Sequence, residues 1–109
     1  MAHDPYQILA HPFSLDGYAV IITGAGGAIG GATARVLAQA GANVVVSDLN
    51  LEAAEATAAT VQKATGRETI AVRTDVTSEA EQQALVDATL KKFGKITARL
   101  DLLAHVLPE

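Results

Sequence analysis

The sequence contains no cysteine and no tryptophan, and it has only two phenylalanines and two tyrosines. Without cysteine, disulfides and thiolate metal sites are excluded, and the composition is compatible with a reducing cytosol. Half of the 109 residues are hydrophobic, so the chain should bury a core. That core must be built from Ala, Val, Leu and Ile, which favours close packing of helices against a sheet.

Positive charge is also scarce, and long apolar runs are absent. The formal net charge is -4, so there is no basic face for nucleic-acid phosphates or an acidic membrane surface. No apolar run approaches the roughly 18 residues that cross a bilayer, and the N-terminus lacks the basic start and apolar stretch of an export signal. We therefore predict a cytoplasmic protein with no nucleic-acid or membrane partner.

The three histidines do not form a metal-binding motif. His3, His11 and His105 lie too far apart for a recognisable ligand spacing, and no cysteine can complete a set. We expect ordinary surface or packed histidines and no metal site.

Apolar runs alternate with segments of helical periodicity. Residues 1–17 carry two prolines and end in the turn signal Asp16-Gly17, so we predict an irregular N-terminal arm followed by one domain over 18–109. Strands are predicted at 18–23, 42–47 and 69–74. This order predicts an α/β fold, an open doubly wound parallel sheet that is incomplete, with three to four strands.

Three helices are predicted between and after these strands. The first begins near Ile29 and is closed by Gly41, the second is capped by Asn50, and the third has Ser78 and Glu81 at capping-box spacing. Gly66 and Gly94 end the second and third helices. The residues expected on the core-facing sides are Ile29, Thr33, Val36, Leu37, Ala40, Leu51, Ala54, Ala58, Val61, Leu85, Val86, Thr89, Leu90 and Phe93.

The last segment reads as a fourth strand at 100–106, ended by Pro108. An open sheet that stops there has an unpaired edge and uncovered apolar surface. We therefore expect self-association or a missing C-terminal half.

A glycine-rich turn, "TGAGGAIG" at residues 23–30, directly follows the first strand and opens the first helix. Glycines there permit positive φ angles and let the backbone approach a pyrophosphate, which the helix N-terminus favours electrostatically. The Thr23 hydroxyl can tie the turn together. The turn predicts a dinucleotide site, with a simple tight bend as the alternative.

An acid follows the second strand at the distance that such a site requires. Asp48 lies eighteen residues beyond Gly30, where a carboxylate can accept bonds from both hydroxyls of an adenosine ribose and repel a 2′-phosphate. This favours NAD over NADP. The alternative is that Asp48 only caps or solvates the start of the next helix.

Asp75 follows the third strand. It can contact adenine through its carboxylate or through the neighbouring Val76 amide, or it can simply start a turn before Ser78. The residues alone leave these alternatives open.

These residues resemble the short-chain dehydrogenase/reductase family, which carries T-G-x-x-x-G-x-G, an acid after strand two and an Asp-hydrophobic pair after strand three. The resemblance covers about residues 14–97. It implies a Rossmann-like fold with NAD as cofactor, NADP being less favoured. Within the family, "IITGAGGAIGGA", "VVVSDLN" and "RTDVTSE" resemble bacterial 7-alpha-hydroxysteroid dehydrogenases.

By this resemblance, Gly24 and Gly30 are the first and last glycines of the motif, Gly26 and Gly27 fill variable places, and the middle glycine is replaced by Ala28. The implied cofactor-binding residues are Thr23, Gly24, Gly26, Gly27, Ile29, Gly30, Asp48, Leu49, Asp75 and Val76.

The family's catalytic residues are absent from the sequence. Asn-Asn-Ala-Gly, the catalytic Ser and Tyr-x-x-x-Lys have no counterpart, and both Tyr6 and Tyr18 precede the glycine turn. His105 as a substitute acid has no partner that would orient it. We therefore assign no catalytic residue.

Three functional hypotheses follow. The first is the NAD-binding N-terminal portion of a short-chain oxidoreductase, acting on an alcohol or carbonyl such as a hydroxysteroid and not catalytic alone. Its truncation could come from a deliberate shortening, a stop codon or a frameshift near Thr97, and the abrupt loss of resemblance after "FGKIT" favours the frameshift. In it, residues 98–109 depart from the family. The second is a non-catalytic nucleotide-binding or interaction module, and the third is a product that does not fold stably.

Overall fold

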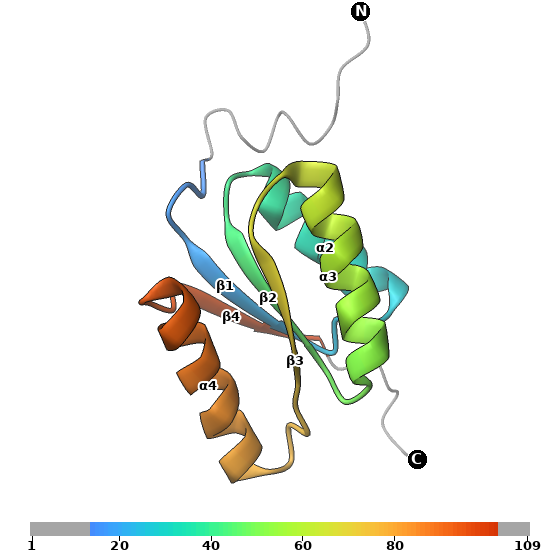
Figure 1. Ribbon diagram of the computed structural model, residues 1–109, viewed down its shortest axis with the longest axis vertical. Coiled ribbons are helices and arrows are strands. Elements are labelled where there is room, and N and C mark those ends of the chain that lie inside the picture. Colours follow the sequence, from blue (N-terminus) through green and yellow to red (C-terminus); the bar gives the residue numbers. More distant parts are fainter. Residues whose placement is uncertain (1–13, 103–109) are drawn as a thin grey trace, which may run out of the picture.

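The computed structural model describes residues 14–102 and contains a four-stranded sheet with helices on both faces (Figure 1). All strand pairs are parallel and the strand order is β3-β2-β1-β4. The elements are β1 (Ala19–Thr23), α2 (Ala28–Gln39), β2 (Asn43–Asp48), α3 (Leu51–Thr65), β3 (Thr69–Arg73), α4 (Glu79–Phe93) and β4 (Ala98–Asp101). The predicted α/β fold with an open parallel sheet is confirmed.

Because every strand runs in the same direction, the carboxyl ends of all four strands lie at one edge of the sheet. Thr23 at the end of β1 is in register with Ser47 of β2 and with Asp101 of β4. Asp48 at the end of β2 is in register with Arg73 of β3. The turns that follow β1, β2 and β3 therefore meet at this edge, which we call the carboxyl edge.

Each face of the sheet has its own apolar core, which explains why the strands are continuous apolar runs. Val20, Ile22, Val44 and Val46 point to the face covered by α2 and α3. Ile21 and Val45 point to the opposite face and pack with Leu85 of α4.

The predicted helix faces are partly wrong, and on α2 the reason is that the helix approaches the sheet through small residues. The buried positions of α2 are Gly30, Ala34 and Ala38, whereas Ile29 is 76% exposed. Leu51 and Leu90 are exposed in the same way. Small side chains let a helix axis lie close to the strands, and the larger apolar side chains beside them are then turned outward.

The helix ends are mostly as predicted. The Asn50 side chain accepts from the Ala53 amide at 3.1 Å, and Gly66 and Gly94 have the left-handed conformation, with φ of 75° and 78°. Helix α2 ends one residue before the C-cap Ala40, and Gly41 follows with φ of 116°. Glycine is needed at these stops because a Cβ disfavours positive φ.

The fourth strand begins at Ala98, two residues earlier than predicted, and is the open edge beside β1. Ala98 and Leu100 are exposed on it. The rest of the predicted strand, residues 103–106, lies outside the described range, as do residues 1–13 and all three histidines. Over 14–102 there is no helix long and apolar enough to cross a membrane and no cluster of side chains able to hold a metal ion.

Candidate nucleotide-binding site

The glycine turn joins β1 to α2 at the carboxyl edge. Gly24 has φ of +68°, a conformation that favours glycine. A Cβ on Gly30 would press on the main chain of Ala25, coming within 2.9 Å of its carbonyl carbon. The turn is also tied to the sheet, because the Ala25 amide donates to the Ser47 carbonyl at 2.9 Å. The two motif glycines are therefore required by geometry.

Among residues 14–102, no side chain caps the N-terminus of α2. The N-cap residue Gly27 makes no side-chain hydrogen bond, and the first turn carries no acidic residue. The first amides of a helix need an outside acceptor. They adjoin a hollow of about 440 Å³, lined by Gly24, Gly27, Ala28, Ile29, Gly30, Asp101 and Leu102. Free amides at the positive end of a helix are the arrangement that binds phosphate.

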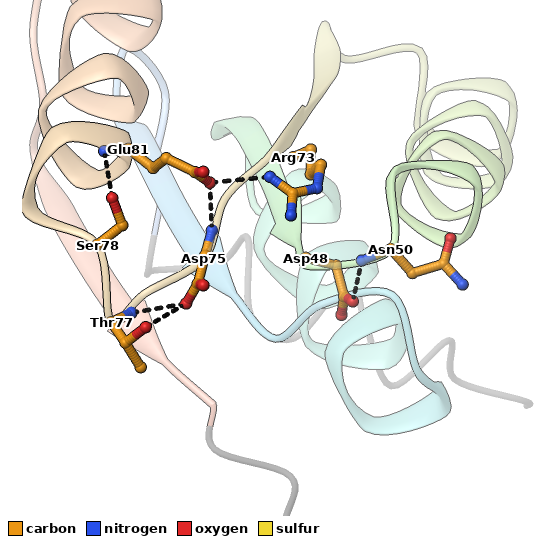
Figure 2. Close-up of polar contacts among 7 residues, drawn as sticks. All are labelled: Asp48, Asn50, Arg73, Asp75, Thr77, Ser78 and Glu81. Carbon is orange, nitrogen blue, oxygen red and sulfur yellow. Dashed lines mark hydrogen bonds and ion pairs between the residues drawn. The ribbon is translucent and has the colours of Figure 1, made fainter.

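Asp48 ties the glycine turn to the end of β2. One carboxylate oxygen accepts from the Gly26 amide at 2.8 Å and the other accepts from the Asn50 amide at 2.9 Å (Figure 2). The carboxylate therefore helps to shape both loops, in agreement with a local structural role. A carboxylate offers about four lone-pair sites, so acceptor capacity is left for ribose hydroxyls, and that role stays a prediction.

Asp75 forms a turn after β3. Its Oδ1 accepts from the Thr77 amide at 2.9 Å and from the Thr77 hydroxyl at 2.6 Å (Figure 2). The Asp75 carbonyl accepts from the Ser78 amide. The Thr77 hydroxyl and amide lower the pKa of the Asp75 carboxyl, and Arg73 adds to this effect. The turn-forming role is thus present, and adenine contact by Asp75 or Val76 stays a prediction.

Glu81 does not complete the predicted capping box. The Ser78 hydroxyl accepts from the Glu81 amide at 3.2 Å, but the Ser78 amide donates to the Asp75 carbonyl. The Glu81 carboxylate instead accepts from the Asp75 amide at 2.8 Å and from Arg73 at 2.9 Å (Figure 2). Glu81 therefore holds the loop after β3 to helix α4.

The sequence suggested that the Thr23 hydroxyl ties the glycine turn together. In the structure it bonds elsewhere. This buried hydroxyl donates to Oδ1 of Asp101 at 2.8 Å, linking the ends of β1 and β4. The Arg99 guanidinium donates to the same oxygen at 2.8 Å. Both bonds lower the pKa of the Asp101 carboxyl, and the bond from Arg99 has the larger effect.

Asp101 and Arg73 had no role predicted from the sequence, and Glu81 had only that of a helix cap. A signal for Asp101 was its place at the end of a parallel strand, where binding sites gather. For Arg73 and Glu81 the signal was opposite charge on the two sides of the Asp75 turn.

These carboxylates predict an acid-sensitive fold. Since the folded chain lowers the pKa of Asp101 below its ordinary value of 3.8, the unfolded chain takes up the proton first as pH falls. The stabilisation is therefore present above pH 3.8 and is lost toward the lower folded pKa; Asp75 acts in the same direction. Urea midpoints should be level from about pH 7 to 5 and fall below about pH 4, with a smaller fall in Asp101→Asn. An equal fall in the variant would contradict this.

The ten predicted cofactor-binding residues gather in the three turns at the carboxyl edge. Ile29 and Leu49 are exposed beside the glycine turn and the Asp48 loop. Tyr18 precedes β1 and so lies at the opposite end of the sheet. Over residues 14–102 the carboxyl edge therefore has groups suited to holding a nucleotide and no tyrosine suited to proton transfer.

Comparison with known proteins gives the same picture. Residues 18–104 match the family model for short chain dehydrogenases. The 7alpha-hydroxysteroid dehydrogenase of Escherichia coli K12 is 48% identical over 82 residues, which make up 75% of this chain and 32% of that protein.

Solved structures agree. A crystal structure of hydroxysteroid dehydrogenase from Escherichia coli has a TM-score of 0.77 and 44% identity, covering 81% of this chain and 37% of that one. That of NAD+-bound xylitol dehydrogenase has a TM-score of 0.73 and 40% identity, covering 77% and 32%. The chain thus spans about a third of the length of these proteins.

Proposed function

Because this chain belongs to the short-chain dehydrogenase/reductase family, we propose that it is the NAD-binding portion of an oxidoreductase. The reaction is hydride transfer between NAD(H) and an alcohol or carbonyl. The relationship to a 7alpha-hydroxysteroid dehydrogenase favours a hydroxysteroid as the substrate.

One observation carries the proposal: the N-terminus of α2, which has no side-chain cap among residues 14–102, adjoins a hollow that is lined by the glycine turn together with Asp101 and Leu102. A pyrophosphate would supply the acceptors that the first amides of α2 lack. Gly24 and Gly30 allow the backbone to approach it, as their conformation and tight packing require glycine. The residues present therefore fit a dinucleotide.

The roles of the other residues follow from their places at the carboxyl edge. Asp48 accepts hydrogen bonds from the hydroxyls of the adenosine ribose, while its bonds to Gly26 and Asn50 hold it in position. Asp75 and Val76 flank the adenine, and Ile29 and Leu49 supply apolar contact. A 2′-phosphate would meet the Asp48 carboxylate, so NAD is favoured over NADP.

The bound nicotinamide supplies the hydride acceptor or donor. In alcohol oxidation the hydride leaves the alcohol carbon and the hydroxyl proton needs a base, and the reverse holds for reduction. This sequence has no Tyr-x-x-x-Lys to serve as that base. We propose that the chain binds cofactor without catalysing the reaction alone.

The open edge at β4 favours a second candidate, a non-catalytic nucleotide-binding or interaction module. Ala98 and Leu100 are exposed on an edge strand that has no partner on its outer side among residues 14–102. Such an edge can pair with a second copy or with the remaining part of the sheet of a longer oxidoreductase.

Titration of the purified chain with NADH by calorimetry tests the proposal. We expect saturable binding, weakened by about 10-fold to 100-fold in Asp48→Asn, because hydrogen bonds to a charged group contribute roughly 1.5–3 kcal/mol. NADPH should bind more weakly than NADH to the wild type.

Asp87→Asn is the matched control, because Asp87 is exposed on α4 and bonds only Gln83 among the described residues. Far-ultraviolet circular dichroism checks that both variants are folded. A folded wild-type chain that gives no heat with NADH would refute nucleotide binding. A native mass above the monomer in the same sample would favour the interaction module.

A further inference from the structure

A cation occupies the strand position next to the acid that we place at the ribose. Arg73 is the last residue of β3 and is the register partner of Asp48, the last residue of β2. Neighbouring strands are about 4.8 Å apart, and register partners have side chains on the same face of a sheet. The two side chains therefore start from neighbouring strand positions on the same face, and Figure 2 shows the Arg73 guanidinium turned from there toward Glu81.

An arginine at this place has the chemistry to bind a phosphate. Its planar guanidinium donates several N–H groups in a geometry that fits phosphate oxygens. Without an ion-pair partner, Arg73 would attract a 2′-phosphate, which the Asp48 carboxylate repels. The sequence therefore contains a potential NADP determinant beside an NAD determinant.

Glu81 forms an ion pair with this guanidinium. Arg73 Nη1 donates to Glu81 Oε1 at 2.9 Å, and the two side chains are 47% and 39% exposed. The same Oε1 accepts from the Asp75 amide at 2.8 Å. Since that bond fixes Glu81 to the loop after β3, the acceptor is held at one place, and Arg73 is drawn toward α4 (Figure 2).

We propose that Glu81 is a specificity-determining positioning residue, which holds and neutralises Arg73 so that the ribose site rejects a 2′-phosphate. The inference rests on the proposed function, because it concerns the same nucleotide site. The preference for NAD then has two causes. Asp48 repels a 2′-phosphate, and Arg73 is paired with Glu81 and so does not bind that phosphate.

The test is the ratio of NADPH to NADH dissociation constants in Glu81→Gln. Glutamine keeps an oxygen that can accept from the Asp75 amide, so the loop after β3 keeps its conformation. The charge of Arg73 is then no longer neutralised by a carboxylate. NADPH binding should strengthen by about threefold to tenfold, as expected for one exposed charge acting at short range, with NADH binding changed by less than about twofold.

Two further variants separate this effect from a general change in charge. Glu79→Gln removes the same charge from the first turn of α4, and Glu79 makes no ion pair over residues 14–102. It should leave the ratio unchanged. Arg73→Gln combined with Glu81→Gln should return the ratio to the wild-type value, because the gain depends on Arg73.

An unchanged ratio in Glu81→Gln would overturn the inference, and so would an equal gain in Glu79→Gln or a gain that survives loss of Arg73. If the wild type binds NADH and the ratio does not respond, only this inference fails. If the wild type binds neither nucleotide, the proposed function fails and the inference falls with it.

Discussion

Gly30→Ala is expected to destabilise the chain by about 3 kcal/mol, a large part of the roughly 5–15 kcal/mol that stabilises an ordinary domain. The added Cβ would meet the Ala25 Cα, would lie 2.9 Å from the Ala25 carbonyl carbon, and would lie 3.0 Å from the Gly24 carbonyl oxygen. These are main-chain atoms of the turn itself, so no flexible side chain can move aside. Urea unfolding followed by circular dichroism measures the loss.

Gly31→Ala is the matched control in the same turn of α2. A Cβ on Gly31 meets only the Thr57 side chain, at 3.6 Å, which is ordinary contact. Because alanine is a better helix former than glycine by about 1 kcal/mol, this variant should be as stable as the wild type or more stable. Equal losses in the two variants would show that close packing at Gly30 is not the cause.

The strands and helix ends could be predicted because the signals for them are local. Val20 to Ile22 and Val44 to Val46 are continuous apolar runs, which suit strands that are covered on both faces. Asn50, Gly66 and Gly94 act on the backbone within a few residues of themselves, so their roles do not depend on the tertiary fold.

The helix faces could not be predicted from apolar spacing alone. Size decides which side of a helix approaches a sheet most closely, so Ala34 and Ala38 are buried and Ile29 is not. Ile29 is also the apolar residue of the predicted cofactor motif, and it lines the hollow beside the glycine turn. Its exposure breaks the pattern expected of a core residue, as would be expected at a binding site.

The polar contacts of the site depend on which strands become neighbours. Thr23 and Asp101 are 78 residues apart, and they meet only because β4 lies beside β1. Arg73 comes next to Asp48 through the register of β2 and β3. The sequence shows that these residues end strands, but strand order and register decide which of them form pairs.

The carboxylates at the carboxyl edge are held by local donors before any ligand arrives. Asp48 accepts from two amides, Asp75 from the Thr77 amide and hydroxyl, and Asp101 from Thr23 and Arg99. Each acid is thus fixed by groups of its own chain. A nucleotide would then bind to a site that needs little reordering, which lowers the entropic cost of binding.

Leu85→Ala is expected to lower the free energy of unfolding by about 2–5 kcal/mol, the range for large-to-small changes in a core. Leu85 is 0% exposed and packs with Ile21 and Val45. Over residues 14–102, α4 is the one helix on this face of the sheet, and Leu85 is its fully buried apolar side chain there. Denaturant unfolding measures the change.

Leu90→Ala is the control on the same helix, because Leu90 is 44% exposed and its truncation should cost less than about 1 kcal/mol. The two variants remove the same atoms from α4, so helix propensity cancels between them and the difference reports burial. Since α4 also carries Glu81, Leu85→Ala should weaken the hold of that residue on the Asp75 loop, whereas Leu90→Ala should not. Equal costs for the two variants would mean that α4 does not pack on the sheet as described.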